Sequence, residues 1–325
     1  MYYNQRAGLR IDDEVTDFFN IEKGVRQGCV LSPDLFNLYS ESIFEVVRKE
    51  KGCSINGQNI TNIRYADDAA LMAFSEEDIQ KLLSTVERES NPKALLLNVK
   101  KTECMVVSKD NNKRPLKLKS LNGESIKEVD KFRYLGSTVT SDARDITTIK
   151  INIAKAKATF GRLRNVLTNS KLSMNVKLSI VNTFVYSVLL YGCEAWTLLK
   201  ESEDRLEAME MWIYRRILKI PWTDKVSNKE VLERMGKERC LLSKIRMRQL
   251  KFFGHVYRHE TMEKLAVSGM IEGKRKRGRQ RTTYLTSLRR ATSDESSNVT
   301  FARMADDRQV WRSMIGNVHK RAGHR

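Results

Sequence analysis

The chain has 325 residues, long enough for more than one domain with its own hydrophobic core. Charged residues make up 30% and hydrophobic residues 41% of it, a composition that excludes an intrinsically disordered protein. Lysine and arginine exceed aspartate and glutamate by 59 − 40 = 19, which favours a polyanionic partner such as nucleic acid.

The five cysteines are scattered without a CxxC pair, which is typical of buried thiols in a reducing compartment. The first residues lack the apolar core of a signal peptide, and the longest apolar run, 180–193, is too short to cross a bilayer. We therefore expect an intracellular protein, nuclear or cytoplasmic, that is not secreted and has no membrane partner. The sequence leaves its oligomeric state open.

The N-terminal part predicts a short hairpin, then a loop and a helix. Residues 1–20 are typical of paired short strands. Gly24 and Gly28 then bracket a tight loop, and Ser32 is expected to cap the helix that follows. Apolar residues recur with helical spacing over 35–47, which predicts that this helix buries one face.

Two adjacent acids, Asp67 and Asp68, lie between apolar, strand-compatible runs over 62–74, which predicts a β-hairpin with both carboxylates at its tip. Paired carboxylates on a rigid hairpin suit Mg²⁺, a hard cation that keeps water ligands and binds substrate phosphates. Two such ions about 3.5–4 Å apart can clamp the attacking and leaving oxygens of a phosphoryl transfer. The alternative is ordinary turn chemistry, because aspartates are common in turns.

The chain offers a comparison for this motif in Asp12 and Asp13, which also lie between short apolar runs and which we interpret as a solvated turn. Acidic Glu14 follows that pair, whereas small and apolar residues bracket Asp67-Asp68. Carboxylates in apolar surroundings need a cation or hydrogen bonds to offset the cost of desolvation. The flanks therefore favour the metal-binding interpretation at the second pair.

The remaining expected elements are a hairpin turning at Asn56-Gly57, a helix over 75–90, strands over 95–99 and 104–107, and short strands over 116–140. From about residue 145 the apolar period changes from two to near 3.6, as helices require. This pattern predicts helices as far as residue 220 and a basic helical stretch over 228–268.

The order of these motifs resembles the reverse transcriptases of non-LTR (LINE-type) retrotransposons, in particular the RTE/BovB-like endonuclease–reverse transcriptases. The matching stretches are Gly24-Val25-Arg26-Gln27-Gly28 with Leu31-Ser32-Pro33, Tyr65-Ala66-Asp67-Asp68, Leu97-Asn98 with Lys100-Lys101-Thr102-Glu103, Phe132-Arg133-Tyr134-Leu135-Gly136, and further on 190–198, 210–220, 253–256 and 273–281. Four ordered motifs are more specific than any one of them. The likeness covers nearly the whole chain.

The resemblance implies an α+β fold. A partial reverse-transcriptase palm, with an antiparallel sheet and helices, would occupy residues 1–145. A helical thumb-like domain would follow over 146–225, and a basic helical nucleic-acid-binding region over 226–325. In this family an upstream palm motif supplies a further metal-binding aspartate. No stretch ahead of Gly24 matches that motif, so we expect an N-terminally truncated protein that lacks the fingers and the first palm motif.

The activity that the resemblance implies is RNA-directed DNA synthesis. It adds dNTPs to the 3′ end of a DNA primer on an RNA template, with Mg²⁺ or Mn²⁺ as cofactor. Because the upstream aspartate is missing, we expect this polymerase activity to be impaired. The alternative is a non-catalytic nucleic-acid-binding fragment of a retrotransposon, either co-opted or decayed.

The resemblance also assigns roles to single residues. Asp67 and Asp68 would be catalytic metal ligands, and Lys101 a catalytic residue beside the triphosphate. The nucleotide and template would contact Arg26, Gln27, Gly28 and Tyr65, and the primer would contact Tyr134, Leu135 and Gly136. The backbone contacts would be Lys155, Arg162, Arg164, Lys274, Arg275, Lys276, Arg277, Arg279 and Arg281. Each role has an alternative. Lys101 could be a solvated lysine at a strand end, and the three primer residues could be core packing plus a turn. The backbone residues could belong to a basic surface that is merely solvated.

A zinc site at Cys240, His255 and His259 is a further hypothesis, because His-x3-His spacing suits zinc, although no second cysteine lies near Cys240. The four tryptophans lie among apolar helical positions and are expected to belong to the core. Whether the three residues bind zinc is left open by the sequence.

Overall fold

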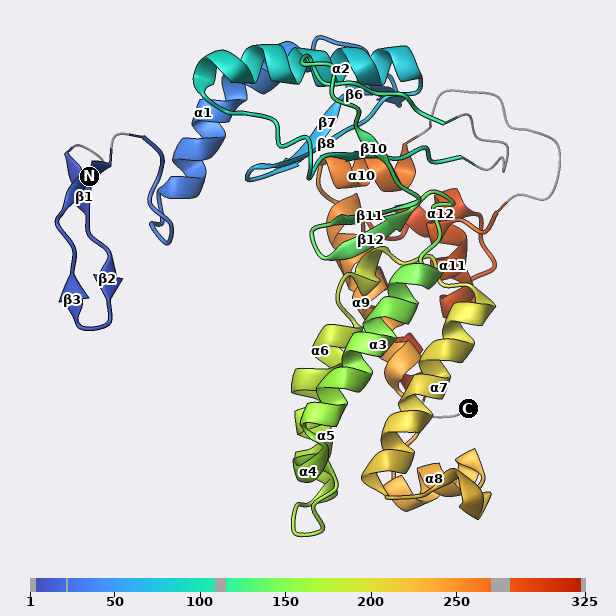
Figure 1. The fold of residues 1–325 in the computed structure, drawn as a ribbon. Coiled ribbons are helices and arrows are strands. Elements are labelled where there is room, and N and C mark those ends of the chain that lie inside the picture. Colours follow the sequence, from blue (N-terminus) through green and yellow to red (C-terminus); the bar gives the residue numbers. More distant parts are fainter. Residues whose placement is uncertain (1–3, 22, 109–114, 270–280, 323–325) are drawn as a thin grey trace. The chain divides into compact units, whose positions relative to one another are not determined.

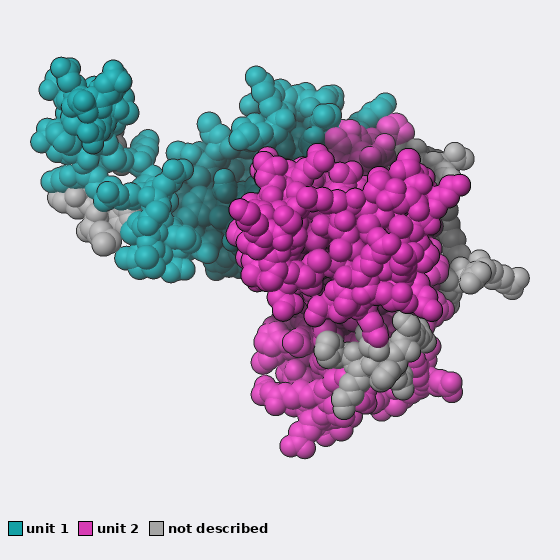
Figure 2. Space-filling model, turned by 90° about the horizontal axis from the view of Figure 1, so that it is seen from below, with its two compact units in different colours: residues 1–104, 116–127 teal, residues 105–115, 128–325 magenta. Residues whose placement is uncertain are grey.

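The structure is a computed structural model that describes residues 4–21, 23–108, 115–269 and 281–322. The chain forms two compact units, which Figure 2 distinguishes by colour. Residues 1–104 with 116–127 are the mixed unit, and residues 105–115 with 128–325 are the helical unit. Antiparallel strand pairs and helices are compatible with the expected α+β class. The domain boundaries expected at residues 145 and 225 stay predictions, as do the palm and thumb assignments.

The N-terminal strands of the mixed unit form two nested pairs. β1 (Gln5–Ala7) pairs antiparallel with β4 (Phe19–Ile21), and between them β2 (Arg10–Ile11) pairs with β3 (Glu14–Val15). The turn of the inner pair begins at Asp12, with a φ of 54°, and its two acids are exposed. The expected hairpin with a solvated acidic turn is therefore confirmed.

Two helices form the core of the mixed unit. α1 (Ser32–Val47) packs against α2 (Glu76–Ser90), and this contact buries Ile43, Phe44, Val47 and Leu82. The buried face expected over 35–47 is right only for the second half of α1, since Leu38 in the first half is 75% exposed. The helical spacing marked one apolar face, but only part of that face has a partner within the described residues.

The two helices begin in different ways. At α2 the Ser75 hydroxyl accepts a hydrogen bond of 3.1 Å from the amide of Asp78, as expected of a capping serine. At α1 Ser32 is the first helical residue, and its hydroxyl donates to the carbonyl of Arg26 at 2.5 Å. The expected cap at Ser32 is therefore wrong, because this hydroxyl closes the preceding loop instead of the helix end.

Two tight hairpins lie between these helices in the sequence. β5 (Cys53–Ile55) pairs with β6 (Gln58–Ile60), and Asn56 and Gly57 turn them with φ values of 51° and 79°. Positive φ at both turn positions is the geometry that Asn-Gly predicts. β7 (Asn62–Tyr65) and β8 (Asp68–Leu71) form the second hairpin, which Figure 1 shows below α2.

The strands expected over 95–99 and 104–107 are mostly wrong. Only β9 (Glu103–Cys104) forms there among the described residues. Leu97 and Val99 pack against a small apolar cluster without making a strand ladder. The alternation of apolar residues here therefore reflects burial in a loop, which a period-two pattern cannot distinguish from a strand.

The helical unit begins with a hairpin and continues as helices, which confirms the change of period after residue 145. β10 (Lys127–Glu128) precedes the pair of β11 (Lys131–Tyr134) and β12 (Ser137–Thr140). The helices are α3 (Ile146–Arg162), α4 (Arg164–Leu167), α5 (Met174–Ile180), α6 (Tyr186–Leu189), α7 (Lys200–Ile217), α8 (Asn228–Met235), α9 (Leu241–Tyr257), α10 (Met262–Ser268), α11 (Tyr284–Thr292), α12 (Asn298–Arg303) and α13 (Arg308–Ala322). A π-helical segment, Val181–Val185, joins α5 to α6.

Two apolar clusters hold the helical unit together. The larger one joins α3, α6 and α7 to the first half of α9. The second lies on the other half of α9, where the helices from α11 to α13 contribute Leu288, Phe301 and Trp311. α9 is therefore the shared support of both clusters.

The Phe253-Gly254-His255 stretch has a packing explanation. The indole nitrogen of Trp311 donates to the carbonyl of Leu250 at 2.8 Å, which brings its ring onto α9. A Cβ added to Gly254 would overlap that indole. Glycine is needed at 254 because no side chain fits between the two helices.

The tryptophans do not all belong to the core. Trp196 and Trp311 are 2% exposed, as expected, but Trp222 is 88% exposed. The core assignment of Trp222 is wrong because it lies in a short turn beyond the last buried position of α7. Within the described residues, no helix has the length and apolar character that crossing a membrane requires.

Candidate active site

The acidic pair lies where the sequence predicted it, at the tip of the β7–β8 hairpin. Tyr65 pairs with Asp68, and a two-residue turn, Ala66-Asp67, connects the strands. Ala66 has a φ of 53°, a left-handed conformation that a residue with a Cβ seldom adopts. Because side chains alternate along a strand, Tyr65 and Asp68 share one face and Arg64 lies on the other.

Arg64 joins this hairpin to α1. Its guanidinium donates to Glu41 at 2.6 Å and lies 4.3 Å from the centre of the Phe44 ring. Arg48 donates to the same carboxylate, and the hydrogen bonds from Arg48 and Arg64 lower the pKa of Glu41. The strand that leads into the acidic pair is thus fixed to the helix that follows the predicted template loop.

Both carboxylates of the pair are exposed, and neither is ion-paired with a described residue. The expected desolvation of Asp67 and Asp68 is therefore wrong, because the neighbouring alanines (Ala66, Ala69 and Ala70) are too small to cover them. In exposure this tip does not differ from the N-terminal acidic turn. The difference is the helix packed beneath it.

The predicted template loop is closed by its own backbone. The amide of Cys29 donates to the carbonyl of Arg26 at 3.3 Å, so Gln27 and Gly28 form the tip of a β-turn. Gly28 has a φ of 83°, which is the requirement of the third position of a type II turn. Arg26, Gln27 and Gly28 are exposed, and no described hydrogen bond joins them to the acidic pair.

Lys101 lies on a turn and not at a strand end. The carbonyl of Asn98 accepts from the amides of Lys101 at 3.0 Å and Thr102 at 2.9 Å. The Asn98 side chain also accepts from the Lys101 amide at 3.2 Å. The ammonium group is exposed, and no described ion pair joins it to Asp67 or Asp68.

The predicted primer-binding residues turn the β11–β12 hairpin of the helical unit. Leu135 and Gly136 have φ values of 47° and 82°, and the hydroxyl of Tyr191 donates to the Leu135 carbonyl at 2.7 Å. A Cβ on Gly136 would lie 3.0 Å from the Tyr191 ring. The sequence analysis missed Tyr191 as a support of this turn, although it lies in the matched stretch 190–198.

The predicted backbone-binding residues fall into three groups. Lys155, Arg162 and Arg164 are exposed on α3 and α4. Arg281 donates to the carbonyl of Asp142 at 2.8 Å. The rest of the basic run, Lys274, Arg275, Lys276, Arg277 and Arg279, lies outside the described residues.

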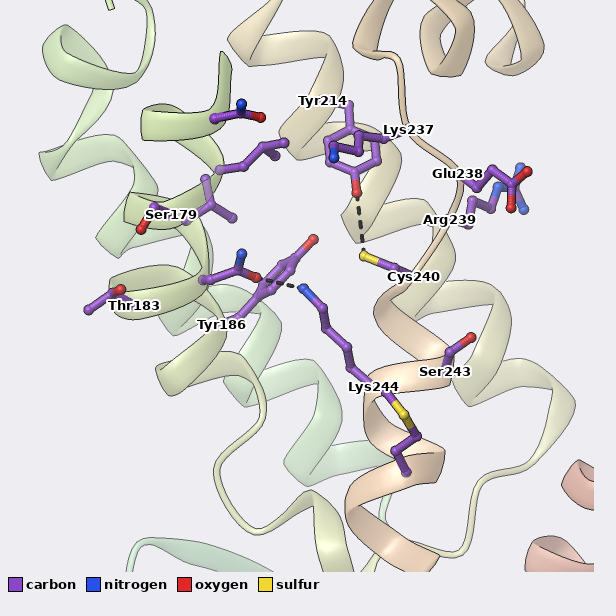
Figure 3. A pocket seen from close by; sticks show the side chains of 15 residues that line it. Ser179, Thr183, Tyr186, Tyr214, Lys237, Glu238, Arg239, Cys240, Ser243 and Lys244 are labelled. Atoms are coloured by element: carbon purple, nitrogen blue, oxygen red, sulfur yellow. Dashed lines mark hydrogen bonds between the residues drawn. The ribbon is translucent and has the colours of Figure 1, made fainter. Parts of the chain in front are cut away.

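A hollow of about 600 Å³ lies between the π-helical segment and the start of α9 (Figure 3). The Lys244 ammonium donates to Asn182 at 2.6 Å, and the Tyr214 hydroxyl lies 3.8 Å from the Cys240 sulfur. Behind them the buried carboxylate of Glu210 accepts from the Tyr214 hydroxyl at 2.8 Å and the Cys240 amide at 2.9 Å. These bonds all use one carboxylate oxygen of Glu210, whereas its second oxygen and the Tyr186 hydroxyl are buried without a hydrogen-bond partner among the described residues.

The hypothesis of a zinc site is not supported. His255 and His259 lie together, with ring centres 4.6 Å apart. Cys240 precedes the same helix, so it is on the order of 22 Å from His255 at 1.5 Å per residue. The described residues contain no cluster of three or more histidine, cysteine or acidic side chains that could hold a metal ion.

The N-terminal part of the chain is similar to a known protein family. Residues 1–139 match the sequence model described as "Reverse transcriptase (RNA-dependent DNA polymerase)". The matched region includes the template loop, the acidic hairpin and the turn at Lys101. This part of the chain is therefore similar to reverse transcriptases.

The similar proteins are products of mobile elements. An uncharacterised transposon-derived protein of Caenorhabditis elegans is 27% identical over 276 residues, which cover 80% of this chain and 97% of that protein. The Pol polyprotein of an R2 retrotransposable element of Nasonia vitripennis is 24% identical over 57% of this chain and 18% of the polyprotein. The R2DM polyprotein of Drosophila melanogaster is 26% identical over 68% of this chain and 21% of its own length.

The chain thus spans less than a quarter of the length of these two R2 polyproteins. The resemblance to the reverse transcriptases of non-LTR retrotransposons is confirmed. The assignment to the RTE/BovB-like subgroup stays a prediction.

Proposed function

We propose that the mixed unit carries the metal-binding hairpin of an RNA-directed DNA polymerase, which adds dNTPs to a DNA primer on an RNA template. The observation that carries this proposal is the pair of unpaired carboxylates, Asp67 and Asp68, on a hairpin that Arg64 fixes to α1. Their oxygens are exposed and unpaired among the described residues, so they are accessible to a cation. The family match of residues 1–139 supports the same chemistry.

The donor set fits a hard divalent cation. Asp67 and Asp68 offer exposed carboxylate oxygens without a competing cation, as Mg²⁺ or Mn²⁺ requires. When bound, such ions neutralise the charge that develops on the transferred phosphate and lower the pKa of the attacking hydroxyl. In this proposal Asp67 is the principal ligand and Asp68 the secondary one.

The other residues position the substrates. The Tyr65 ring, which is 64% exposed and opposite Asp68, supports the nucleotide at the primer end. Gln27 and Gly28 contact the template through the exposed turn, and Arg26 follows the template backbone. Lys101 neutralises the triphosphate. The Leu135–Gly136 turn, fixed by Tyr191, would hold the primer strand.

We also infer that polymerase activity of this chain is weak. A two-metal site holds both ions between several carboxylates, and a loosely held ion positions neither oxygen well. Among the described residues no third acidic, histidine or cysteine ligand joins the pair. A further carboxylate is needed for a complete site.

Primer extension tests this proposal. The purified chain is given an RNA template annealed to a DNA primer, dNTPs and Mg²⁺ or Mn²⁺. We expect Asp67→Asn to reduce extension by about 100-fold or more, since positioning and charge neutralisation supply most of the catalysis. Asp12→Asn, the matched exposed turn acid, should extend like the wild type. Equal extension by both variants would contradict a role for the hairpin.

The second candidate is a non-catalytic nucleic-acid-binding protein. The observation that favours it is the charge of residues 146–180, which contain seven basic residues and no acid: Lys150, Lys155, Lys157, Arg162, Arg164, Lys171 and Lys177. Absence of extension by the wild-type chain, together with salt-dependent binding of a primer–template duplex, would favour this candidate.

A further inference from the structure

Trp222 is the exception among the tryptophans. It is 88% exposed, whereas Trp196 and Trp311 are 2% exposed and Trp212 is half-buried. A large aromatic side chain left in water forgoes the stabilisation that burial would give. Exposed aromatic rings are enriched where proteins bind partners, because they offer a large contact area at a low entropic cost.

The turn that carries Trp222 is held firmly. Pro221 precedes it, and the Trp222 carbonyl accepts from the amide of Lys225 at 3.3 Å in the 3-10 turn. The Arg215 guanidinium of α7 donates to the carbonyl of Val226 at 2.7 Å and to the side chain of Asn228 at 3.0 Å. On the other side of the turn, the amide of Ile220 donates to the Arg215 carbonyl at 2.9 Å. Because both sides of the turn are held by Arg215, binding through the indole would order little additional chain.

The charges around the turn favour an anionic partner. Residues 215–229 contain five basic side chains, Arg215, Arg216, Lys219, Lys225 and Lys229, and one acid, Asp224. Lys219 and Lys225 are exposed and flank Trp222 in the sequence. The acid-free stretch 146–180 lies in the same unit.

The Trp212 ring contacts one cation from each of the two basic stretches, 146–180 and 215–229. Arg216 of α7 lies 4.4 Å from the centre of its ring, and Lys157 of α3 lies 5.4 Å from it. Phe160 of α3 contacts the ring edge-on at 5.2 Å. α3 and α7 are neighbouring helices in Figure 1, so their cations meet on one side of the helical unit.

We propose that Trp222 and the cations of this part of the helical unit, Lys157, Arg216, Lys219 and Lys225, bind single-stranded nucleic acid with one base stacked on the Trp222 indole. The cations contact the phosphates, and the indole contacts a base. An unpaired strand fits best, because the bases of a duplex already stack on each other. This inference rests on the nucleic-acid-binding part of the proposed function and does not depend on catalysis.

Fluorescence anisotropy with a labelled single-stranded oligonucleotide tests the stacking contact. We expect Trp222→Ala to weaken binding about 5- to 100-fold, and Trp222→Phe to stay within about threefold of the wild type, as stacking on any aromatic face predicts. Val299→Ala is the matched control, because Val299 is also exposed, at 61%, but lies on α12. An unchanged thermal transition of Trp222→Ala would show that the helical unit is intact.

An oligonucleotide of the same length with abasic sites separates stacking from phosphate contact. The wild type should bind it about as weakly as Trp222→Ala binds the intact strand, and the variant should show no further loss. Equal affinity of wild type and Trp222→Ala for the intact strand would overturn the proposal. The proposal would also be overturned if Trp222→Ala weakened binding of the abasic strand as much as binding of the intact strand. The contribution of Trp222 would then not depend on a base. The assay contains no dNTPs and no divalent cation, so its result does not depend on polymerase activity.

Discussion

Arg64 and Glu41 are 23 positions apart in the sequence, and the guanidinium of one donates to the carboxylate of the other at 2.6 Å. Arg64 stands three residues before Asp67, so this pair ties the acidic hairpin to α1. Phe44 provides a ring against which the guanidinium packs. This ion pair with its aromatic support therefore helps to set the position of the acidic tip relative to α1, together with Leu71 of β8, which packs against the apolar cluster of α1 and α2.

Arg64→Gln tests this support. The pair is partly exposed, so we expect a loss of only about 0.5–1 kcal/mol in local stability. The amides of β7 and β8 should exchange hydrogen faster, measured by mass spectrometry. Arg48→Gln is the matched control, since Arg48 pairs with the same carboxylate from within α1 and should leave hairpin exchange unchanged. Equal exchange in both variants would contradict a special role for Arg64.

The same pair predicts a pH dependence. Hydrogen bonds from Arg48 and Arg64 lower the pKa of Glu41 below its ordinary value of 4.5. A lowered carboxyl pKa adds stability above the unfolded-state value, and this stability is lost as the pH falls through the folded-state value. We therefore expect the protection factors of the hairpin amides, which are corrected for the intrinsic exchange rate at each pH, to fall below about pH 4.5 in the wild type and to change less in Glu41→Gln. A parallel response in both proteins would refute this assignment.

The acidic pair should bind a metal ion that the N-terminal acidic turn does not. Titration with Mn²⁺, followed by electron paramagnetic resonance, compares Asp67→Asn/Asp68→Asn with Asp12→Asn/Asp13→Asn. Both double variants lose the same two exposed charges. We expect at least about a tenfold loss of affinity only in the first, because two carboxylates on a supported hairpin present their oxygens together.

Gly254→Ala should destabilise the helical unit by about 1–3 kcal/mol, the usual cost of overpacking. The added methyl group would overlap the Trp311 indole. Gly161→Ala is the control, since nothing lies within 4 Å of its added Cβ and alanine favours a helix by about 0.5–1 kcal/mol. Thermal unfolding followed by circular dichroism should therefore shift in opposite directions for the two variants.

Cys193 should resist thiol reagents in the native protein. It is 0% exposed, and burial raises its pKa to about 12, so almost no thiolate forms at neutral pH. Labelling with a disulfide reagent at pH 8, with mass spectrometry of peptides, should modify the partly exposed Cys29 first. Rapid modification of Cys193 without denaturant would contradict the described packing around it.

Local chemistry was enough to predict several elements. Asn56 and Gly57 turn their hairpin because both accept positive φ, and Ser75 caps α2 because its hydroxyl reaches the amide of Asp78. The acidic pair lies at its hairpin tip because apolar strands bracket a two-residue turn. In each case the residues that decide the geometry lie within a few positions of one another.

Other features could not be read from a local pattern. The alternation over 95–99 is typical of a strand, but these side chains pack as a loop. Ser32 has the composition of a cap, but its hydroxyl bonds to Arg26. Periodicity reports which side chains are buried and not what they are buried against, so it cannot choose between these structures.

The sequence by itself determined the resemblance to reverse transcriptases, the acidic hairpin, the helical character of the second half and the excess of positive charge. Only the tertiary structure decided that Arg64 meets Glu41, that Tyr191 holds the carbonyl of Leu135, and that Trp222 is left in water. Motifs and turns depend on neighbours in the chain. Ion pairs, long-range hydrogen bonds and exposure depend on which distant elements pack together.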